Sequence, residues 1–187
     1  MRRVHHHSQI NHLAKERQAM DLRSLQRPLK DKYRADPGTS TITLRARASQ
    51  SELPVACSVD LGRAIYAAEA HAGVGGPGTG ACSGDLLLGA LAACAQITCQ
   101  MVATSMGVPV RRIDVVVEGT LDLRGTLGIA RDVPVGFETI RCRFEIDAPE
   151  ASSDQIEGLK ERAERYCVVR QTLKAPPPIA VEWAAPA

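Results

Sequence analysis

The sequence predicts an α+β domain in which antiparallel strands cover a long central helix. Two observations carry this prediction. Residues 83–107 form an apolar segment with no charge after Asp85, and helix signals mark both of its ends. On either side of this segment, short runs alternate apolar and polar residues with the period of two that is typical of strands.

The central helix is predicted from its end signals and its composition. Ser83 can accept a free backbone N–H at the helix start, and Asp85 follows where the helix dipole favours an anion. Gly107 can adopt the left-handed conformation that ends a helix, and Pro109 follows. Because the segment is apolar on all sides, it should be buried in a protein core or in a bilayer. Its many small and polar residues favour a core helix covered by sheets over a membrane span.

Strand patterns and short helices occupy most of the remaining chain. Three candidates with short connections predict an antiparallel meander at 41–48, 55–59 and 64–70. A second antiparallel pair is predicted at 110–123 and 136–146, joined by residues 125–135. Ser152 and Gln155 form a capping-box signal for a helix that ends at about Tyr166. A short helical segment at 168–174 and a last alternating strand at 179–183 complete the chain.

The first 38 residues are polar and are interpreted as an N-terminal helical arm, with the main domain at 39–187. Helical spacing extends over 10–33 and is expected to break near Pro28. The turn at 36–38 marks the boundary. The three histidines at 5–7 are interpreted as part of a solvated tail.

Composition narrows the possible functions. Aromatic residues make up 3% of the 187 residues and the net charge is +2, which indicates neither a nucleic-acid nor a membrane partner. Six cysteines without a secretory pattern at the start predict a cytoplasmic protein. No CxxC or CxxH spacing indicates a metal site. The glycines at 73, 75 and 78 match GxGxxG but lack a helix directly after them, so no dinucleotide cofactor is expected.

Two cysteines lie in segments with distinctive flanks. Cys94 is in the middle of the central helix, and Cys167 directly follows the helix that starts after Ser152. Either thiol alone would be interpreted as a core residue. The segment DLLLGALAACAQIT, then the strand GFETIRCRFEI, and then YCVVRQTL occur in an order and spacing that resemble the OsmC/Ohr family. These are the osmotically inducible and organic hydroperoxide resistance proteins, and the resemblance covers roughly residues 41–183.

The resemblance implies an intertwined homodimer in which antiparallel sheets wrap two central helices. It also implies thiol-dependent reduction of organic hydroperoxides, with Cys94 as the peroxidatic thiol and Cys167 as the resolving thiol. Sulfenic acid chemistry fits these roles, and an external dithiol would return the resulting disulfide to thiols. The alternative is an OsmC-like protein without peroxidase activity, whose dimer pocket binds a small hydrophobic molecule.

The sequence departs from the family pattern near these thiols. The peroxidase branch has a Glu ten residues before the peroxidatic Cys, where this chain has Gly84, and Asp85 is shorter and about 100° further around the helix. Val168 replaces the usual proline. Candidates for the activating arginine are Arg45, Arg47 and Arg63. Packing is the expected role of Cys99 and Cys142, while Cys57 and Cys82 have no assigned partner.

Overall fold

The computed structural model describes residues 22–36, 38, 47–50, 56–60 and 65–184 of the chain. The chain divides into two compact units, residues 1–44 and 45–187. In the first unit, helix α2 spans Leu22–Ala35 and contains Pro28. The predicted break near Pro28 is therefore wrong, because a proline removes only one N–H bond and the helix continues through it. The rest of the predicted arm lies outside the described residues.

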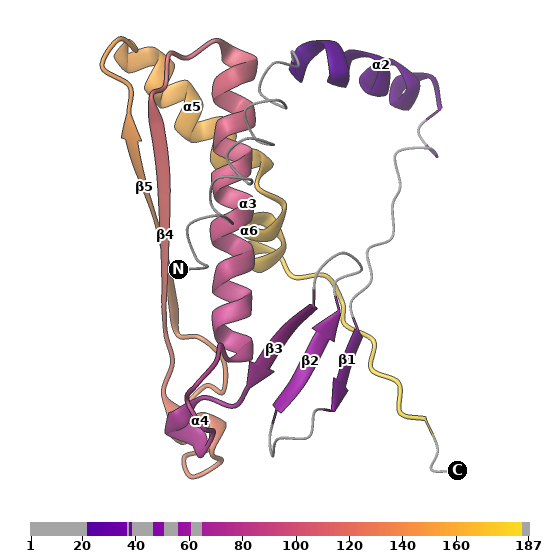
Figure 1. The fold of residues 1–187 in the computed structure, drawn as a ribbon, viewed down its shortest axis with the longest axis vertical. Helices are drawn as coiled ribbons and strands as arrows, with labels where there is room; N and C mark the ends of the chain where they lie inside the picture. The colour runs from indigo at the N-terminus through magenta and orange to yellow at the C-terminus, as the bar shows by residue number, and fades with distance from the viewer. Residues whose placement is uncertain (1–21, 37, 39–46, 51–55, 61–64, 185–187) are drawn as a thin grey trace, which may run out of the picture. The chain divides into compact units, whose positions relative to one another are not determined.

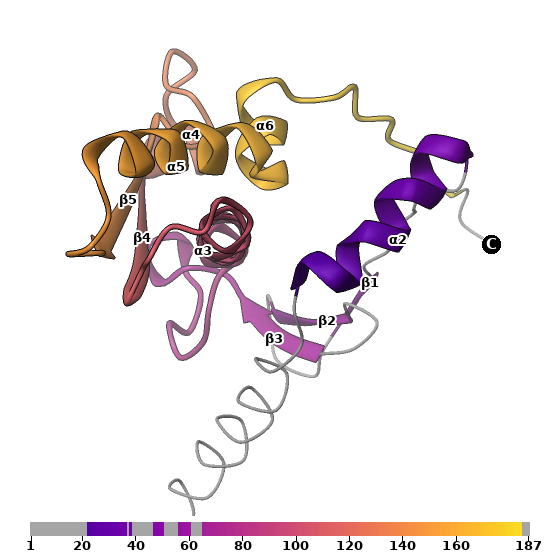
Figure 2. The same ribbon diagram turned by 90° about the horizontal axis from the view of Figure 1, so that it is seen from above.

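The second unit is organised around helix α3, Ser83–Met106, as predicted. Cys82 and not Ser83 is the N-cap, and the Asp85 carboxylate accepts the Cys82 backbone N–H at 2.9 Å. Gly107 ends the helix with a φ of 69°, in the left-handed region that favours glycine. Among the described residues, α3 is the one helix long and apolar enough to cross a bilayer. In the structure it packs against β4 on one side and α5 on another (Figure 2).

The first sheet is the predicted antiparallel meander of three strands. These are β1 at Arg47–Gln50, β2 at Ala56–Asp60 and β3 at Ile65–Glu69, paired in that order. Of the predicted strand 41–48, residues 41–46 lie outside the described residues.

The glycine-rich loop follows β3 with a single 3₁₀ turn, η2, at Ala72–Val74. A Cβ atom at Gly76 would lie 1.7 Å from the carbonyl oxygen of Ala70, so the loop can fold back on itself only with glycine there. Helix α3 begins several residues beyond this turn, which agrees with the interpretation of the glycines as a loop.

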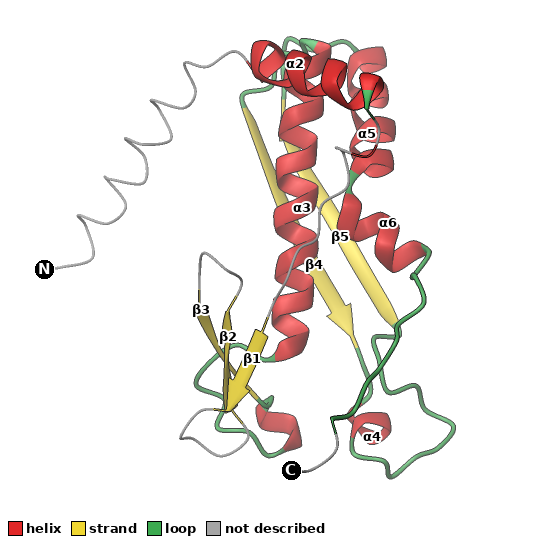
Figure 3. Cartoon of the chain, turned by 90° about the vertical axis from the view of Figure 1, so that its right-hand side faces the viewer, coloured by secondary structure: helices red, strands yellow, loops and turns green. Residues whose placement is uncertain are grey.

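The second sheet is an antiparallel hairpin that runs alongside α3 (Figure 3). It pairs β4, Arg112–Thr120, with β5, Thr139–Asp147, which confirms the second predicted pair. The strand predicted to reach residue 123 ends at Thr120, because Asp122 caps the short helix α4 at Leu123–Thr126 and accepts the Arg124 N–H.

Two helices complete the domain. Helix α5 spans Ser153–Tyr166 and begins with the predicted reciprocal cap between Ser152 and Gln155. Helix α6 spans Val168–Lys174, so Cys167 is the single residue between them (Figure 1). The predicted strand at 179–183 is wrong. No other described strand pairs with it, and its apolar side chains are exposed, with Trp183 at 91%.

The core lies where α3, α5 and the β4–β5 hairpin meet. Leu159 of α5 is fully buried and packs with residues of α3 and β4, namely Cys99, Val102, Ala103 and Ile113. The α+β class with antiparallel sheets is therefore confirmed. Because Leu159 and Ala163 are both buried, the core also fixes α5 and with it the position of Cys167, the residue that follows this helix.

We expect Leu159→Ala to lower the free energy of unfolding by about 3 kcal/mol, since it leaves a cavity in the centre of this core. Urea unfolding followed by circular dichroism measures the change. Leu127→Ala is the control, because Leu127 is 51% exposed and its truncation should cost little. Equal losses in the two variants would contradict this description of the core.

Candidate functional site

The structure brings Cys94 and Cys167 together although 73 residues separate them in the sequence. The two thiols lie within hydrogen-bonding reach of each other, and both are free. Packing explains the contact. Cys167 is buried against Leu91, which lies three residues before Cys94 in α3, and against Ala95, which directly follows Cys94. The middle of α3 therefore meets the junction between α5 and α6.

Several hydrogen-bond donors surround the Cys94 sulfur. They are the backbone amides of Val169 and Val168 in the first turn of α6, the Cys167 thiol and the Thr98 hydroxyl, which lies 4.0 Å away. Partial burial raises the pKa of Cys94, but these donors together outweigh burial and leave the pKa below that of an ordinary cysteine. A thiolate at this position is therefore stabilised by neutral groups of the described residues.

Cys167 differs from Cys94 in burial and in protonation. Its side chain is 1% exposed. Burial raises the pKa of Cys167, and the neighbouring Cys94 raises it further. Because the thiolate is the nucleophilic form, the arrangement makes Cys94 the reactive thiol of the pair and leaves Cys167 protonated beside it.

The other described cysteines have different surroundings. Cys99 is buried in the core, and burial raises its pKa, which agrees with the expected packing role. Burial also raises the pKa of Cys142, which points from β5 toward α6. Cys82 caps α3, and the Cys57 side chain lies outside the described residues. Among the described residues, no group of three His, Cys, Asp or Glu side chains could hold a metal ion.

The acidic residue near the start of α3 does not reach the thiol pair. Asp85 is held by the Cys82 amide, and nine residues of helix place it about 13.5 Å along the axis from Cys94. At Gly84, the position at which the resemblance implies a Glu in the peroxidase branch, a Cβ atom would lie 3.3 Å from the Phe137 ring. The Phe137 ring therefore occupies the space beside position 84. The three candidate arginines, Arg45, Arg47 and Arg63, have side chains outside the described residues.

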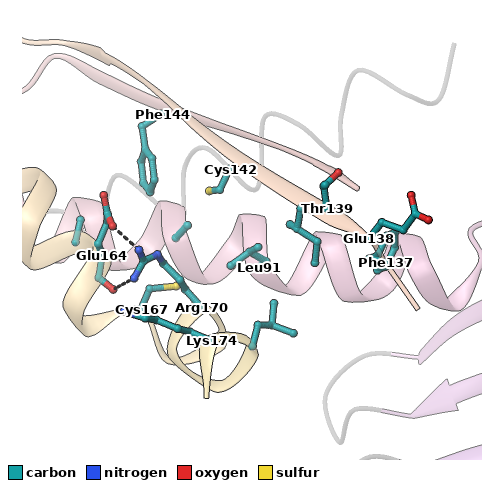
Figure 4. A pocket seen from close by; sticks show the side chains of 14 residues that line it. Leu91, Phe137, Glu138, Thr139, Cys142, Phe144, Glu164, Cys167, Arg170 and Lys174 are labelled. Carbon is teal, nitrogen blue, oxygen red and sulfur yellow. Dashed lines mark hydrogen bonds and ion pairs between the residues drawn. The ribbon is translucent and has the colours of Figure 1, made fainter. Parts of the chain in front are cut away.

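An ion pair that the sequence did not reveal holds the junction around Cys167. Arg170 of α6 pairs with the Glu164 carboxylate of α5 and donates to the Glu164 carbonyl at 3.3 Å. Gln171 donates to the same carbonyl at 2.9 Å. The pair crosses from one helix to the next at a spacing of six, which no helical pattern in the sequence indicates. Figure 4 shows Arg170 and Glu164 on the wall of a cavity that Cys167 and Cys142 also line.

Comparison with known proteins identifies the family. The model of the family described as OsmC-like protein matches residues 76–182, which is more than half of the chain and includes both thiols. The chain belongs to the OsmC family. No protein with a curated description matches it.

Solved structures share the fold at low sequence identity. An OsmC-like protein from Mycoplasma pneumoniae is 19% identical with a TM-score of 0.60, over 72% of this chain and 89% of that chain. The organic hydroperoxide resistance protein OsmC from Legionella pneumophila is 16% identical with a TM-score of 0.55, over 72% and 90%. An organic hydroperoxide resistance protein from Elizabethkingia anophelis is 16% identical with a TM-score of 0.54, over 73% and 91%.

We expect the alkylation rate of Cys94 by iodoacetamide to rise with pH at a midpoint below that of an ordinary free cysteine, because its pKa is lowered. The reason is that hydrogen-bond donors hold its pKa low, so the thiolate persists as the pH falls. Peptide mass spectrometry at each pH measures the rate for each thiol separately. Cys142 serves as the internal control, since burial raises its pKa and its midpoint should lie above that of Cys94. The reverse order of midpoints would refute the assignment of Cys94 as the activated thiol.

Proposed function

We propose that the protein is a thiol peroxidase that reduces organic hydroperoxides, with Cys94 as the peroxidatic thiol and Cys167 as the resolving thiol. The observation that carries the proposal is the contact between two free thiols whose pKa values are displaced in opposite directions. Membership of the OsmC family supports it. The structural neighbours from Legionella and Elizabethkingia are both named organic hydroperoxide resistance proteins, which also supports the proposal.

The catalytic cycle starts with the Cys94 thiolate, which attacks one oxygen of the hydroperoxide. The O–O bond breaks, the alcohol leaves with a proton, and Cys94 becomes a sulfenic acid. The Cys167 sulfur then attacks the Cys94 sulfur, and water leaves as the disulfide forms. An external dithiol reduces this disulfide by exchange and is itself oxidised. The Val168 and Val169 amides act at the first step, where they stabilise the attacking thiolate.

A second copy of the chain is proposed to cover one face of α3. Leu87, Ile97 and Met101 are 39%, 55% and 40% exposed, and their helical positions place them on one stripe within about 80°. Cys94 lies on the same stripe by its position in the helix. Apolar side chains in a row are typical of a subunit interface. The homodimer would therefore enclose the reactive thiol, and its free cysteines fit a reducing cytoplasm.

The alternative function is binding of a small hydrophobic molecule without peroxidase chemistry. The replacement of the family Glu by Gly84, with the Phe137 ring beside it, favours this reading. The two functions differ in what happens to the thiols. A binding protein would leave Cys94 and Cys167 reduced in the presence of a hydroperoxide, whereas a peroxidase must join them.

We expect one equivalent of a lipophilic hydroperoxide, such as cumene hydroperoxide, to produce a Cys94–Cys167 disulfide in the reduced protein. Cys94→Ser should abolish hydroperoxide consumption, because it removes the attacking sulfur. Cys167→Ser should consume one equivalent and then stop, with a sulfenic acid on Cys94. Peptide mass spectrometry locates the products. Cys99→Ser is the control without a role in the cycle, and the peroxidase proposal fails if the wild-type protein keeps Cys94 as a free thiol.

We expect the wild-type protein to be a homodimer in light scattering at micromolar concentration. Ile97→Glu should shift it to monomer, since it places a charge in the centre of the apolar stripe on α3. Leu127→Glu is the matched control, because Leu127 is similarly exposed and lies far from this stripe in the chain. A wild-type protein that is a stable folded monomer would contradict the proposed assembly.

A further inference from the structure

Cys167 has two different surroundings. On one side its thiol is within hydrogen-bonding reach of Cys94. On another side it lines a cavity of about 580 Å³, and Cys94 is not among the residues that line this cavity. In a Cys94–Cys167 disulfide, only Cys167 would therefore border this cavity. The surface of Cys167 that solvent reaches is small, at 1% exposure.

The cavity is lined by residues of α3, β5, α5 and α6 around the α5–α6 junction. Leu91 of α3 forms its floor, β5 supplies one wall, and α6 supplies the wall opposite (Figure 4). The walls are mainly apolar. Four charged residues also line the cavity, namely Glu138 next to β5, Glu164 of α5, and Arg170 and Lys174 of α6. Its volume is several times the roughly 150 Å³ of an apolar protein cavity that binds benzene. A small thiol reductant can therefore enter it without displacing the helices.

The chemistry of disulfide exchange favours attack on Cys167. A thiolate that attacks one sulfur expels the other, and the sulfur with the lower pKa leaves faster. Hydrogen-bond donors lower the pKa of Cys94 even though burial opposes them, whereas burial raises the pKa of Cys167. Attack at Cys167 thus expels the better leaving group into a site that already holds donors for it.

The cysteine on the facing wall does not supply the attacking thiolate. Cys142 also lines the cavity, but burial raises its pKa, and the nearby Glu164 opposes the lowering effect of Arg170. Cys142 therefore stays protonated near neutral pH and is a weak nucleophile. The attacking group has to come from outside the protein.

We propose that this cavity admits the external thiol that regenerates the protein, and that this thiol attacks the Sγ atom of Cys167. The incoming sulfur bonds to Cys167 as the Cys94–Cys167 bond breaks, and Cys94 leaves as the thiolate. The second thiol of the reductant then closes its own disulfide, and Cys167 leaves as a thiolate and takes up a proton. The inference rests on the proposed function only in that it takes the disulfide as the species to be reduced.

The direct test asks which sulfur the reductant attacks. The wild-type protein is oxidised with diamide, treated briefly with the monothiol 2-mercaptoethanol, and quenched with N-ethylmaleimide. Peptide mass spectrometry should find the mercaptoethanol adduct on Cys167 and the maleimide on Cys94. An adduct on Cys94 overturns the proposal, and so does the failure of diamide to join the two cysteines. Diamide forms the disulfide without a hydroperoxide. A protein that does not react with hydroperoxides would therefore refute the peroxidase function, while this experiment would still show which sulfur the reductant attacks.

A second test closes the entrance. Leu173 is an α6 residue that lines the cavity, while its neighbour Thr172 is exposed and does not line it. Leu173→Trp should slow the reduction of the diamide-formed disulfide by dithiothreitol about tenfold, since the larger side chain fills the open side of the cavity and keeps the reductant from its attack position. Thr172→Trp on the same helix should leave the rate as in the wild type. Equal rates for the two variants would overturn the assignment of the cavity as the entrance.

Discussion

The contact between the middle of α3 and the α5–α6 junction is the constraint on which the site depends. Cys94 is fixed by a helix that packs on both β4 and α5, and Cys167 is fixed by the end of α5. The fully buried Leu159 anchors α5 against α3 in the neighbouring cluster, with Cys99, Val102 and Ala103. The Glu164–Arg170 pair links the end of α5 to the first turn of α6. The helices that position the two thiols are thus the same helices that form the hydrophobic core.

The difference between the two thiols arises from the backbone as much as from side chains. Starting α6 at Val168 turns two amide groups toward the Cys94 sulfur, because the first amides of a helix have no partner within it. A thiolate held by amides keeps its partners when side chains vary. The same turn buries the Cys167 side chain. One change of chain direction thus produces a reactive thiol and a protected one.

The sequence predicts the elements with strong local signals and fails where the outcome depends on distant residues. Helix α3, the reciprocal cap at Ser152 and the pairing of β4 with β5 follow from spacing and from capping residues. Residues 179–183 alternate as a strand would, yet a strand needs a neighbour, and none of the described strands pairs with them. Cys94 and Cys167 can be selected from their flanks, but their contact and the Glu164–Arg170 pair come from the packing of α5 and α6 against the core.

The ring of Phe137 beside Gly84 links two positions that are 53 residues apart. A Cβ atom at position 84 would be 3.3 Å from this ring, and one at Gly119 would be 2.6 Å from it, so the aromatic side chain fills the space between α3 and β4. A side chain at position 84 therefore requires the Phe137 ring to give way by a few tenths of an ångström, and a smaller residue at 137 would remove that requirement. The two positions therefore form an epistatic pair, in which the order of substitutions matters.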